Sequence, residues 1–458
     1  MKPTEIKIAC IGGGSRYWAR VLINELALAP RLTGRLDLYD VNLDATRRNV
    51  QVAGAIFARP EARTRFKVRA VSRLDDALKG ADFVMISIEP GEMEMRYADV
   101  VIPSRYGILQ PCGDTAGPAG TMRALRTLPL YEGFVRSIEK HCPKAWVFNY
   151  SNPMTICTGA LHALFPQIKA FGCCHEVFTS QHRLASLVAD WFGVPKPPRQ
   201  EIVIDLTGLN HFTWVTEAHW QGHDLLSRLR REIAVPGFFR SRVRDALRRK
   251  RLERWFEPSG MVGYDFLRRF NALGFAGDRH LVEFVPWYVR SEAELHRWGT
   301  IITPYSWRLK RANLVDHDPK YYARQPLRPT GEDVARIIES LVGHGPLITN
   351  VNLPNRGQAP DLPLGHVVET NARFDQNLLT PMVAKALPPA ACALVRRAAD
   401  VQALVLRAAL TRDIDLAFQA ILTDPLVSLT TDQAWSMFIA MLNHTREMLP
   451  GFKLPSDS

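Results

Sequence analysis

Short apolar runs alternate with helix-like segments over the first 150 residues, and this alternation is the strongest constraint on the fold. Strands are expected at Lys7–Ile11, Arg35–Tyr39, Lys67–Val71, Phe83–Ile88 and Ala145–Asn149. Strands separated by helices predict an α/β protein with a parallel, doubly wound, Rossmann-like sheet. Ligands of such sheets bind at the carboxyl ends of the strands. We therefore expect functional residues directly after these runs.

A chain of 458 residues is long for one domain. The segment Val194–Pro198 contains three prolines and is typical of a linker or sharp turn. We expect a Rossmann-like domain over residues 1–195. Residues 196–458 are expected to form a C-terminal mixed α+β domain.

The chain carries 58 Lys and Arg against 46 Asp and Glu, a formal charge of +12. The excess is locally dense, as in Arg240–Arg251, where a solvated helix face is the ordinary explanation. The alternatives are a nucleic-acid surface and a field that attracts anionic substrates. No nucleic-acid motif accompanies the basic residues, so an anionic small molecule is the more useful hypothesis and no nucleic-acid partner is expected.

Seven cysteines show neither zinc-finger spacing nor a small disulfide framework, which favours a reducing, cytoplasmic location. The N-terminus has no basic segment followed by a long apolar stretch, so no signal peptide is expected. No run of 18 apolar residues occurs, which argues against a membrane span.

A glycine-rich turn follows the first strand and opens a helix. Gly12, Gly13, Gly14 and Ser15 allow the backbone to approach a pyrophosphate, although Tyr17 breaks the full glycine fingerprint. Asp40 ends the second strand, where an acid accepts hydrogen bonds from ribose hydroxyls and favours NAD over its phosphorylated form. Ser87, near the end of Phe83–Ile88, completes the candidate set. The alternative is a structural turn followed by a helix-capping Asp40.

Three further polar clusters follow predicted strands: Asn149–Pro153, Cys173–Glu176 and Asn210-His211. Cys and His bind divalent transition metals, and Asn amides suit sugar hydroxyls. Each cluster also has an ordinary explanation, since Cys is often buried in a core and Asn-Pro is a common turn.

The chain resembles glycoside hydrolase family 4 from end to end. The resemblance rests on ordered matches at 7–15, 96–107, 114–118, 149–153, 174–175, 208–211, 277–286 and 351–357. It implies a two-domain arrangement like that of lactate and malate dehydrogenases, bound NAD, and an assembly of two or four identical subunits.

The same resemblance implies roles for individual residues. Cys174 and His211 would hold a divalent metal, usually manganese, and Asn149 and Asn152 would hold the sugar. Asp114 stands where relatives commonly have Glu, which makes its role near the metal or sugar less secure.

The tetrapeptide Cys174-His175-Glu176-Val177 resembles that of the α-galacturonidase subgroup, which implies cleavage of α-linked galacturonic acid. α-Glucuronidase and α-galactosidase are the alternatives within the family. Arg96 and Arg279 are candidates for the uronate carboxylate, since a guanidinium binds it bidentately. A surface ion pair is the alternative for Arg279.

The reaction implied by the resemblance is oxidation at C3 of the sugar, loss of the C2 proton, elimination, addition of water and re-reduction. Asp278 is the nominated C2 base, with Asp265, Tyr264 and His280 as competitors and a turn residue as the ordinary alternative. His175 is the candidate that assists leaving-group departure.

Two other function classes stay open from the sequence. An NAD-dependent 2-hydroxy-acid dehydrogenase would share the fold but needs no Cys and His metal pair. A non-catalytic NAD-binding scaffold would not need the Asn pair either.

Overall fold

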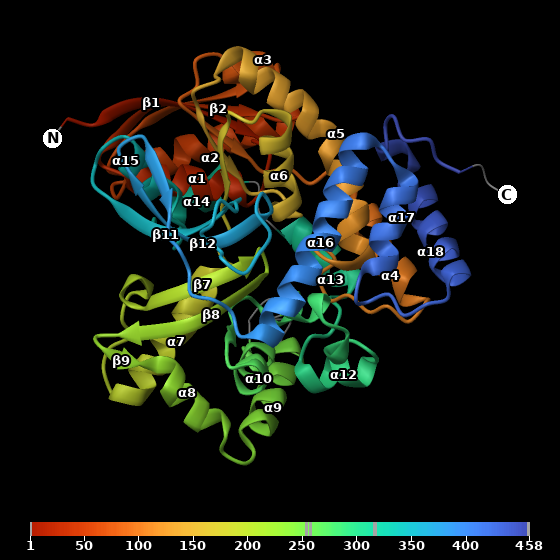
Figure 1. Ribbon diagram of the computed structural model, residues 1–458. Helices are drawn as coiled ribbons and strands as arrows, with labels where there is room; N and C mark the ends of the chain where they lie inside the picture. Colours follow the sequence, from red (N-terminus) through yellow and green to blue (C-terminus); the bar gives the residue numbers. More distant parts are fainter. Residues whose placement is uncertain (1, 252–254, 256–258, 315–317, 456–458) are drawn as a thin grey trace.

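The computed structural model describes residues 2–251, 255, 259–314 and 318–455 (Figure 1). The strands are β1 (Thr4–Ile11), β2 (Leu32–Tyr39), β3 (Phe66–Val71), β4 (Phe83–Ile86), β5 (Trp146–Asn149), β6 (Lys169–Gly172), β7 (Val203–Leu209), β8 (Phe212–Trp220), β9 (His223–Asp224), β10 (Leu273–Gly274), β11 (Leu347–Pro354), β12 (Val367–Asp375) and β13 (Leu378–Pro381).

Helices make up most of the rest. They are α1 (Trp18–Leu28), α2 (Leu43–Phe57), α3 (Leu74–Leu78), α4 (Met93–Ser104), α5 (Gly117–His141), α6 (Met154–Leu164), α7 (Glu176–Phe192), α8 (Leu225–Ile233), α9 (Phe238–Arg251), α10 (Met261–Phe270), α11 (Asp278–Leu281), α12 (Glu292–Trp298), α13 (Tyr305–Leu314), α14 (Pro319–Arg324), α15 (Val334–Leu341), α16 (Pro389–Thr411), α17 (Ile414–Thr423) and α18 (Thr431–His444).

The first six strands confirm the predicted doubly wound sheet. They are parallel and lie in the order β3-β2-β1-β4-β5-β6. The chain builds outward in opposite directions from β1 and β4, so the loops after these two strands diverge and leave a crevice. Ligands of open α/β sheets bind at such a point.

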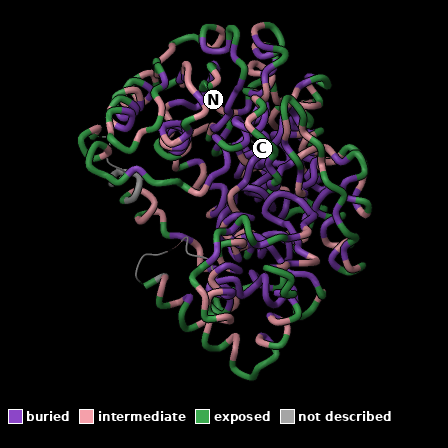
Figure 2. Tube along the Cα trace, turned by 90° about the vertical axis from the view of Figure 1, so that its left-hand side faces the viewer, coloured by how far each residue is buried: buried purple, intermediate pink, exposed green. Residues whose placement is uncertain are grey.

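Helices cover both faces of this sheet. Successive side chains of a strand point to opposite sides, so each strand contributes to two buried clusters. Ile8 and Cys10 of β1 pack in one cluster with side chains of α1, α2 and α15. Ala9 and Ile11 pack in the other, with side chains of α3, α5 and α6. Figure 2 shows buried segments gathered in the interior and exposed segments along the outline.

The large sheet continues across the boundary expected near residue 195. Strands β11, β12 and β13 add to it beside β6, and β11 pairs antiparallel with β6 through Asn352 and Gly172. Helices α16 and α17 pack against α5, so the C-terminal part wraps around the first (Figure 1). The division into 1–195 and 196–458 stays a prediction, and the sheet does not follow it.

A second sheet is built on the antiparallel hairpin of β7 and β8, to which β9 and β10 are added. The hairpin turns at Asn210 and His211, and His211 adopts a φ of 65°, a left-handed conformation that is rare outside glycine. This turn places the His211 side chain beside Asp114 and Thr115.

Other sequence expectations are also settled by the described residues. No helix among them is long and apolar enough to cross a bilayer. All seven cysteines are described, and each is a free thiol. In the Arg-rich helix α9, Arg244 and Arg248 are exposed while Ala246 is buried, which is the amphipathic arrangement of a solvated helix.

Candidate functional site

A cavity of about 800 Å³ opens at the carboxyl ends of β1 and β4. Five of the six residues expected to bind a dinucleotide line it: Gly12, Gly14, Ser15, Asp40 and Ser87. The sixth, Gly13, lies beneath the loop, where a Cβ would approach the Cβ of Leu38 to 2.7 Å. The glycines therefore bring the loop against the sheet and leave the space above it open.

The glycine loop is held by specific contacts. Gly12 has a φ of +87°, and a Cβ there would lie 1.9 Å from the carbonyl oxygen of Ser87. The amide of Gly14 donates to Asp40 at 3.0 Å. Asn49 of α2, which sequence reasoning missed, donates to the carbonyls of Gly13 and Ser15 at 2.8 and 2.9 Å. A side chain at Gly12 would collide with the Ser87 backbone, so glycine is needed for this loop, and the loop fits a bound dinucleotide.

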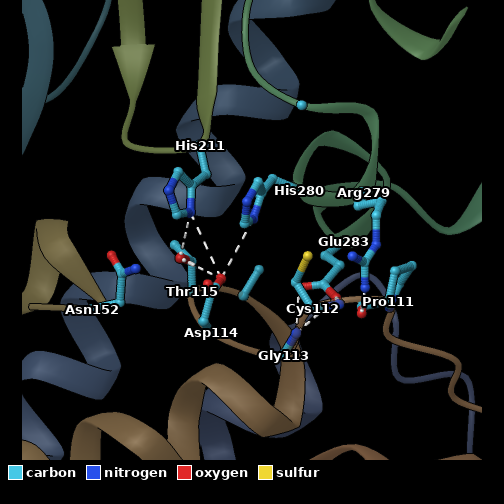
Figure 3. Close-up of polar contacts among 12 residues, drawn as sticks. Pro111, Cys112, Gly113, Asp114, Thr115, Asn152, His211, Arg279, His280 and Glu283 are labelled. Carbon is cyan, nitrogen blue, oxygen red and sulfur yellow. Dashed lines mark hydrogen bonds and ion pairs between the residues drawn. The ribbon is translucent and has the colours of Figure 1, made fainter. Parts of the chain in front are cut away.

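A second group of polar side chains lies deeper in the same region. Ligand atoms of Asp114, His211 and His280 all lie within 4.8 Å of one another, although they come from three segments distant in sequence. Figure 3 shows both imidazoles directed toward the Asp114 carboxylate. Nδ1 of His280 lies 3.4 Å from Asp114, and Nδ1 of His211 lies 3.8 Å from the same oxygen. Two imidazoles and one carboxylate are a donor set that suits a divalent transition metal.

The surroundings orient these three side chains. The hydroxyl of Thr115 is 2.8 Å from Nδ1 of His211 and fixes the ring. Burial and the neighbouring His280 lower the pKa of His211 to about 3, so its imidazole is neutral, the form that binds metals. Burial opposes protonation of His280, but Cys112 and Asp114 outweigh it and raise the pKa of that imidazole well above its ordinary value.

The thiol expected to bind the metal lies just outside this cluster. Cys174 follows β6 and is buried, and burial raises the pKa of its thiol well above the ordinary value. Asn210, the neighbour of His211, lies beside the Cys174 side chain. Among the described residues, the grouped ligand atoms belong to Asp114, His211 and His280. The pairing of Cys174 with His211 therefore stays a prediction, and His280 joins the candidate ligands.

The two asparagines expected to hold a sugar differ in their surroundings. The Asn149 side chain is fully buried: it accepts from the Tyr131 hydroxyl at 2.6 Å and donates to Thr158 at 3.1 Å. Asn152 lines the cavity, and its buried side-chain oxygen has no hydrogen-bond partner among the described residues. Of the pair, Asn152 has hydrogen-bonding capacity left for a ligand.

His175 and Glu176 lie beside the cluster. The ring of His175 packs on Trp18, which lines the cavity, with centroids 5.6 Å apart, and its side chain keeps 39% of its exposure. Glu176 accepts from the amide of Gly277 at 2.6 Å and lies 3.9 Å from Nε2 of His280. Glu176, the residue after Cys174-His175, thus contacts the segment that carries His280.

The nominated base, Asp278, is engaged elsewhere. Its carboxylate accepts from the Ser259 hydroxyl at 2.5 Å and from the amides of Met261 and Val262 at 3.0 and 2.9 Å. It thereby caps the start of α10 and is absent from the residues that line the cavity. The geometry supports the structural alternative, and we assign Asp278 no proton transfer.

Two of the competing base candidates, Asp265 and Tyr264, are also absent from the lining of the cavity. Asp265 forms ion pairs with Arg268 and Arg269 and accepts from Tyr288 at 2.8 Å. The ring of Tyr264 is buried against Phe238. His280 is the remaining candidate, and it lies in the cluster.

The two arginines considered for a carboxylate also differ. Arg96 lines the cavity and forms an ion pair with Glu89 at 2.9 Å, which Arg123 shares at 3.2 Å. Arg279 instead donates to the carbonyl of Pro111 and to Thr303, which ties its guanidinium into the protein interior (Figure 3).

One buried acid near the cluster went unnoticed in the sequence. Glu283 accepts from the amides of Cys112 and Gly113 at 2.5 and 2.9 Å, and so holds the loop that carries Asp114. Burial, followed by the charge of Asp114, raises the pKa of Glu283 to about 7. Its place inside the matched stretch 277–286 was the only available signal.

Comparison with known protein families gives two matches that together cover most of the chain. Residues 7–189 match the model described as family 4 glycosyl hydrolase. Residues 206–427 match the C-terminal domain of the same family. A protein of Thermoanaerobacterium saccharolyticum named alpha-galacturonidase is 41% identical, over 99% of this chain and 98% of its own length.

Solved structures agree with these matches. The crystal structure of the Bacillus subtilis protein lplD, described as a glucosidase, has a TM-score of 0.86 at 38% identity and covers 96% of this chain and all of that one. The 6-phospho-beta glucosidase of Thermotoga maritima, solved with manganese, NAD+ and glucose-6-phosphate, has a TM-score of 0.75 at 20% identity, covering 97% and 99% of the two chains. A Plasmodium falciparum malate dehydrogenase has a TM-score of 0.53 at 15% identity, covering 90% and 99%, which confirms the expected dehydrogenase-like arrangement.

Proposed function

The chain belongs to family 4 of the glycosyl hydrolases and is a glycosidase, and on this premise we propose that it cleaves α-linked galacturonic acid from oligogalacturonides, the fragments of pectin. One observation carries the proposal. Four relatives named alpha-galacturonidase are 36–41% identical over nearly their whole length, whereas two relatives named alpha-galactosidase are 26–27% identical. The Cys174–Val177 tetrapeptide and the excess of positive charge agree with an anionic sugar.

NAD and a divalent metal belong to the same proposal, and we take the metal to be manganese, with which a family relative was solved. The loop of Gly12, Gly13 and Gly14, with Asp40 and Ser87, would hold the dinucleotide. His211, Asp114 and His280 would hold the metal, with Cys174 adjacent. When bound, the nicotinamide supplies a reversible hydride acceptor and the metal a Lewis acid.

The chain's own residues would position the sugar between these two places. Asn152 has a buried oxygen free to accept from a sugar hydroxyl. Asn149 holds the start of the same loop. Its side-chain oxygen accepts from the amide of Ser151 at 3.1 Å. His175, partly exposed and packed on Trp18, is the proposed proton donor to the departing oxygen.

Location and assembly form the last part of the proposal. Seven free thiols suit a reducing compartment, and we place the enzyme in the cytoplasm. We further propose a homodimer or homotetramer.

The proposal is tested with nitrophenyl α-galacturonide, α-glucuronide, α-galactoside and a phosphorylated α-glucoside, each with NAD, manganese and a thiol reductant. We expect turnover of the galacturonide, lost when either NAD or the metal is removed. Preferential turnover of the phosphorylated glucoside would contradict the substrate. Accumulation of NADH without release of nitrophenol would instead indicate a dehydrogenase.

A further inference from the structure

A small recess lined by two arginines lies between α4 and α13, next to the main cavity. Arg96 of α4 lines both spaces, and Arg308 of α13 lines the recess together with Thr303 and Cys112. Sequence reasoning identified Arg96 but not Arg308. Because Arg96 lines both spaces, a ligand in the cavity can contact the side chain that borders the recess.

Helix α13 is held in place by contacts one turn before Arg308. The ring of Tyr305 stacks on Tyr97 of α4 with centroids 4.6 Å apart, and its hydroxyl donates to Glu94. Residues three positions apart lie on the same face of a helix. Arg308 therefore faces α4 and Arg96 for the same reason that Tyr305 does.

The arginines at this recess have few acidic neighbours. Arg96 shares the carboxylate of Glu89 with Arg123. Arg308 is half-buried, and its guanidinium forms no hydrogen bond or ion pair with any residue that the structure describes. Nε of Arg96 and Nη1 of Arg123 are likewise buried without a partner among the described residues.

The electrostatics of Arg308 agree with this arrangement. Burial and the like charges of Arg96 and Arg279 lower the pKa of its guanidinium to about 10. Glu89 and Asp114 are the acids within reach, and Asp114 already lies between two imidazoles. Arg308 and Arg96 thus lie near Glu89 and Asp114, and both of these acids also interact with Arg123. A bound anion would relieve the repulsion.

We propose that Arg308 and Arg96 bind the carboxylate of the substrate's uronic acid, with Arg279 as a positioning residue that holds the Pro111 loop beneath them. The inference rests on the proposed function, because it takes the substrate to be a galacturonide. A guanidinium fork binds a planar carboxylate bidentately, which a hydroxymethyl group cannot reproduce. A neutral galactoside would leave Arg308 buried beside two cations, and this cost discriminates against it.

The test compares Arg308→Gln and Arg308→Lys with the wild-type enzyme, with Arg290→Gln as the control because Arg290 is exposed. We expect Arg308→Gln to lower the ratio of kcat/KM for the galacturonide to that for the galactoside about 100-fold, since hydrogen bonds to charged groups contribute about 1.5–3 kcal/mol. The ratio for Arg308→Lys should lie between those of the wild type and Arg308→Gln, because lysine keeps the charge and lacks the planar, two-pronged guanidinium. Arg290→Gln should leave the ratio unchanged. An equal loss on both substrates, or no loss, would overturn the inference.

A binding measurement separates this inference from the proposed function. Free D-galacturonate is titrated by calorimetry into the holoenzyme, with D-galactose as the neutral comparison. We expect binding of galacturonate that Arg308→Gln weakens about 100-fold and that Arg290→Gln does not change. Arg308-dependent binding by an enzyme that cleaves no galacturonide would support the anion site and refute the proposed function. Cleavage of the galacturonide, together with galacturonate binding that does not depend on Arg308, would support the proposed function and refute the anion site.

Discussion

The imidazole rings of His211 and His280 stack with centroids 4.0 Å apart and their planes at 27°. Both face the carboxylate of Asp114 (Figure 3). A divalent cation lets both rings bind as neutral ligands. Two stacked imidazoles beside one carboxylate are therefore an arrangement that can hold a metal.

If His280 binds the metal, His280→Ala should weaken manganese binding at least about 10- to 100-fold, since even residues that only support a ligand have effects of that size. Calorimetric titration of manganese into the metal-free protein measures it, and NAD affinity should stay within about twofold. His296→Ala is the control, because His296 is exposed on α12. Unchanged manganese affinity in His280→Ala would remove His280 from the ligand set.

The position of Cys174 leads to a separate expectation. Its thiol lies beside Asn210 and is not among the grouped ligand atoms, so its part in metal binding needs its own test. We expect Cys174→Ser to abolish metal-dependent turnover while circular dichroism and the melting temperature stay near the wild-type values. Cys392→Ser, on α16, is the control. Full turnover by Cys174→Ser with manganese would show that Asp114, His211 and His280 suffice.

Asp40 has two partners that make its effect on the dinucleotide predictable. It accepts from the amide of Gly14 at 3.0 Å and from that of Asn42 at 2.9 Å, so its carboxylate both orders the glycine loop and faces the cavity. Asp40→Ala should weaken NAD binding about 10- to 100-fold, because hydrogen bonds to charged groups contribute about 1.5–3 kcal/mol. Titration followed by tryptophan fluorescence measures it. Asp44→Ala, an exposed neighbour on α2, should bind NAD normally.

The dinucleotide loop could be predicted because its signal is local. The apolar strand, the glycines, the helix and Asp40 follow one another within 40 residues, and each has its own backbone requirement. The same holds for the parallel strands β1 to β5, each of which is a short apolar run. Strands β11 to β13 were missed, since the pairing of Asn352 with Gly172 across the edge of β6 joins segments that are distant in sequence.

The metal cluster could be predicted only in part, for the same reason. His211 was found through resemblance, but its grouping with His280 depends on how α11 packs against the β7–β8 hairpin. Arg308 had no sequence signal, because unpaired charge is a property of the folded surroundings. Asp278 looked like a base in an ordered motif, yet Ser259 and the first amides of α10 surround its carboxylate.

That arrangement makes Asp278 a stability residue in a direct test. Asp278→Ala leaves the buried amides of Met261 and Val262 without an acceptor, and we expect a loss of about 2–4 kcal/mol in the free energy of unfolding. Denaturant titration measures it, with the exposed Asp245→Ala of α9 as the control. A variant as stable as the wild type but inactive would restore Asp278 as the catalytic base.

Asp424 provides a pH dependence of stability that is independent of the metal site. It is buried where α17 ends, and it accepts from the amides of Gly117 and Leu426 at 3.1 and 2.9 Å. Burial raises the pKa of its carboxyl from 3.8 to about 6, against smaller opposing effects from these amides and Arg397. Between these two values the folded protein holds a proton that the unfolded chain releases. The contribution to stability is therefore complete below pH 3.8 and is lost as pH rises through 6.

We expect Asp424→Asn to remove this dependence, because the amide has no proton to lose in that range. The wild-type advantage over the variant in the free energy of unfolding should shrink by about 3 kcal/mol as pH rises from about 4 to above 6, since each pKa unit corresponds to about 1.4 kcal/mol. Denaturant titrations at several pH values measure the difference, and Asp400→Asn, exposed on α16, should follow the wild type throughout. A difference that grows with rising pH would mean that the folded state favours the charged carboxylate, which its burial beside two amides and one distant arginine argues against.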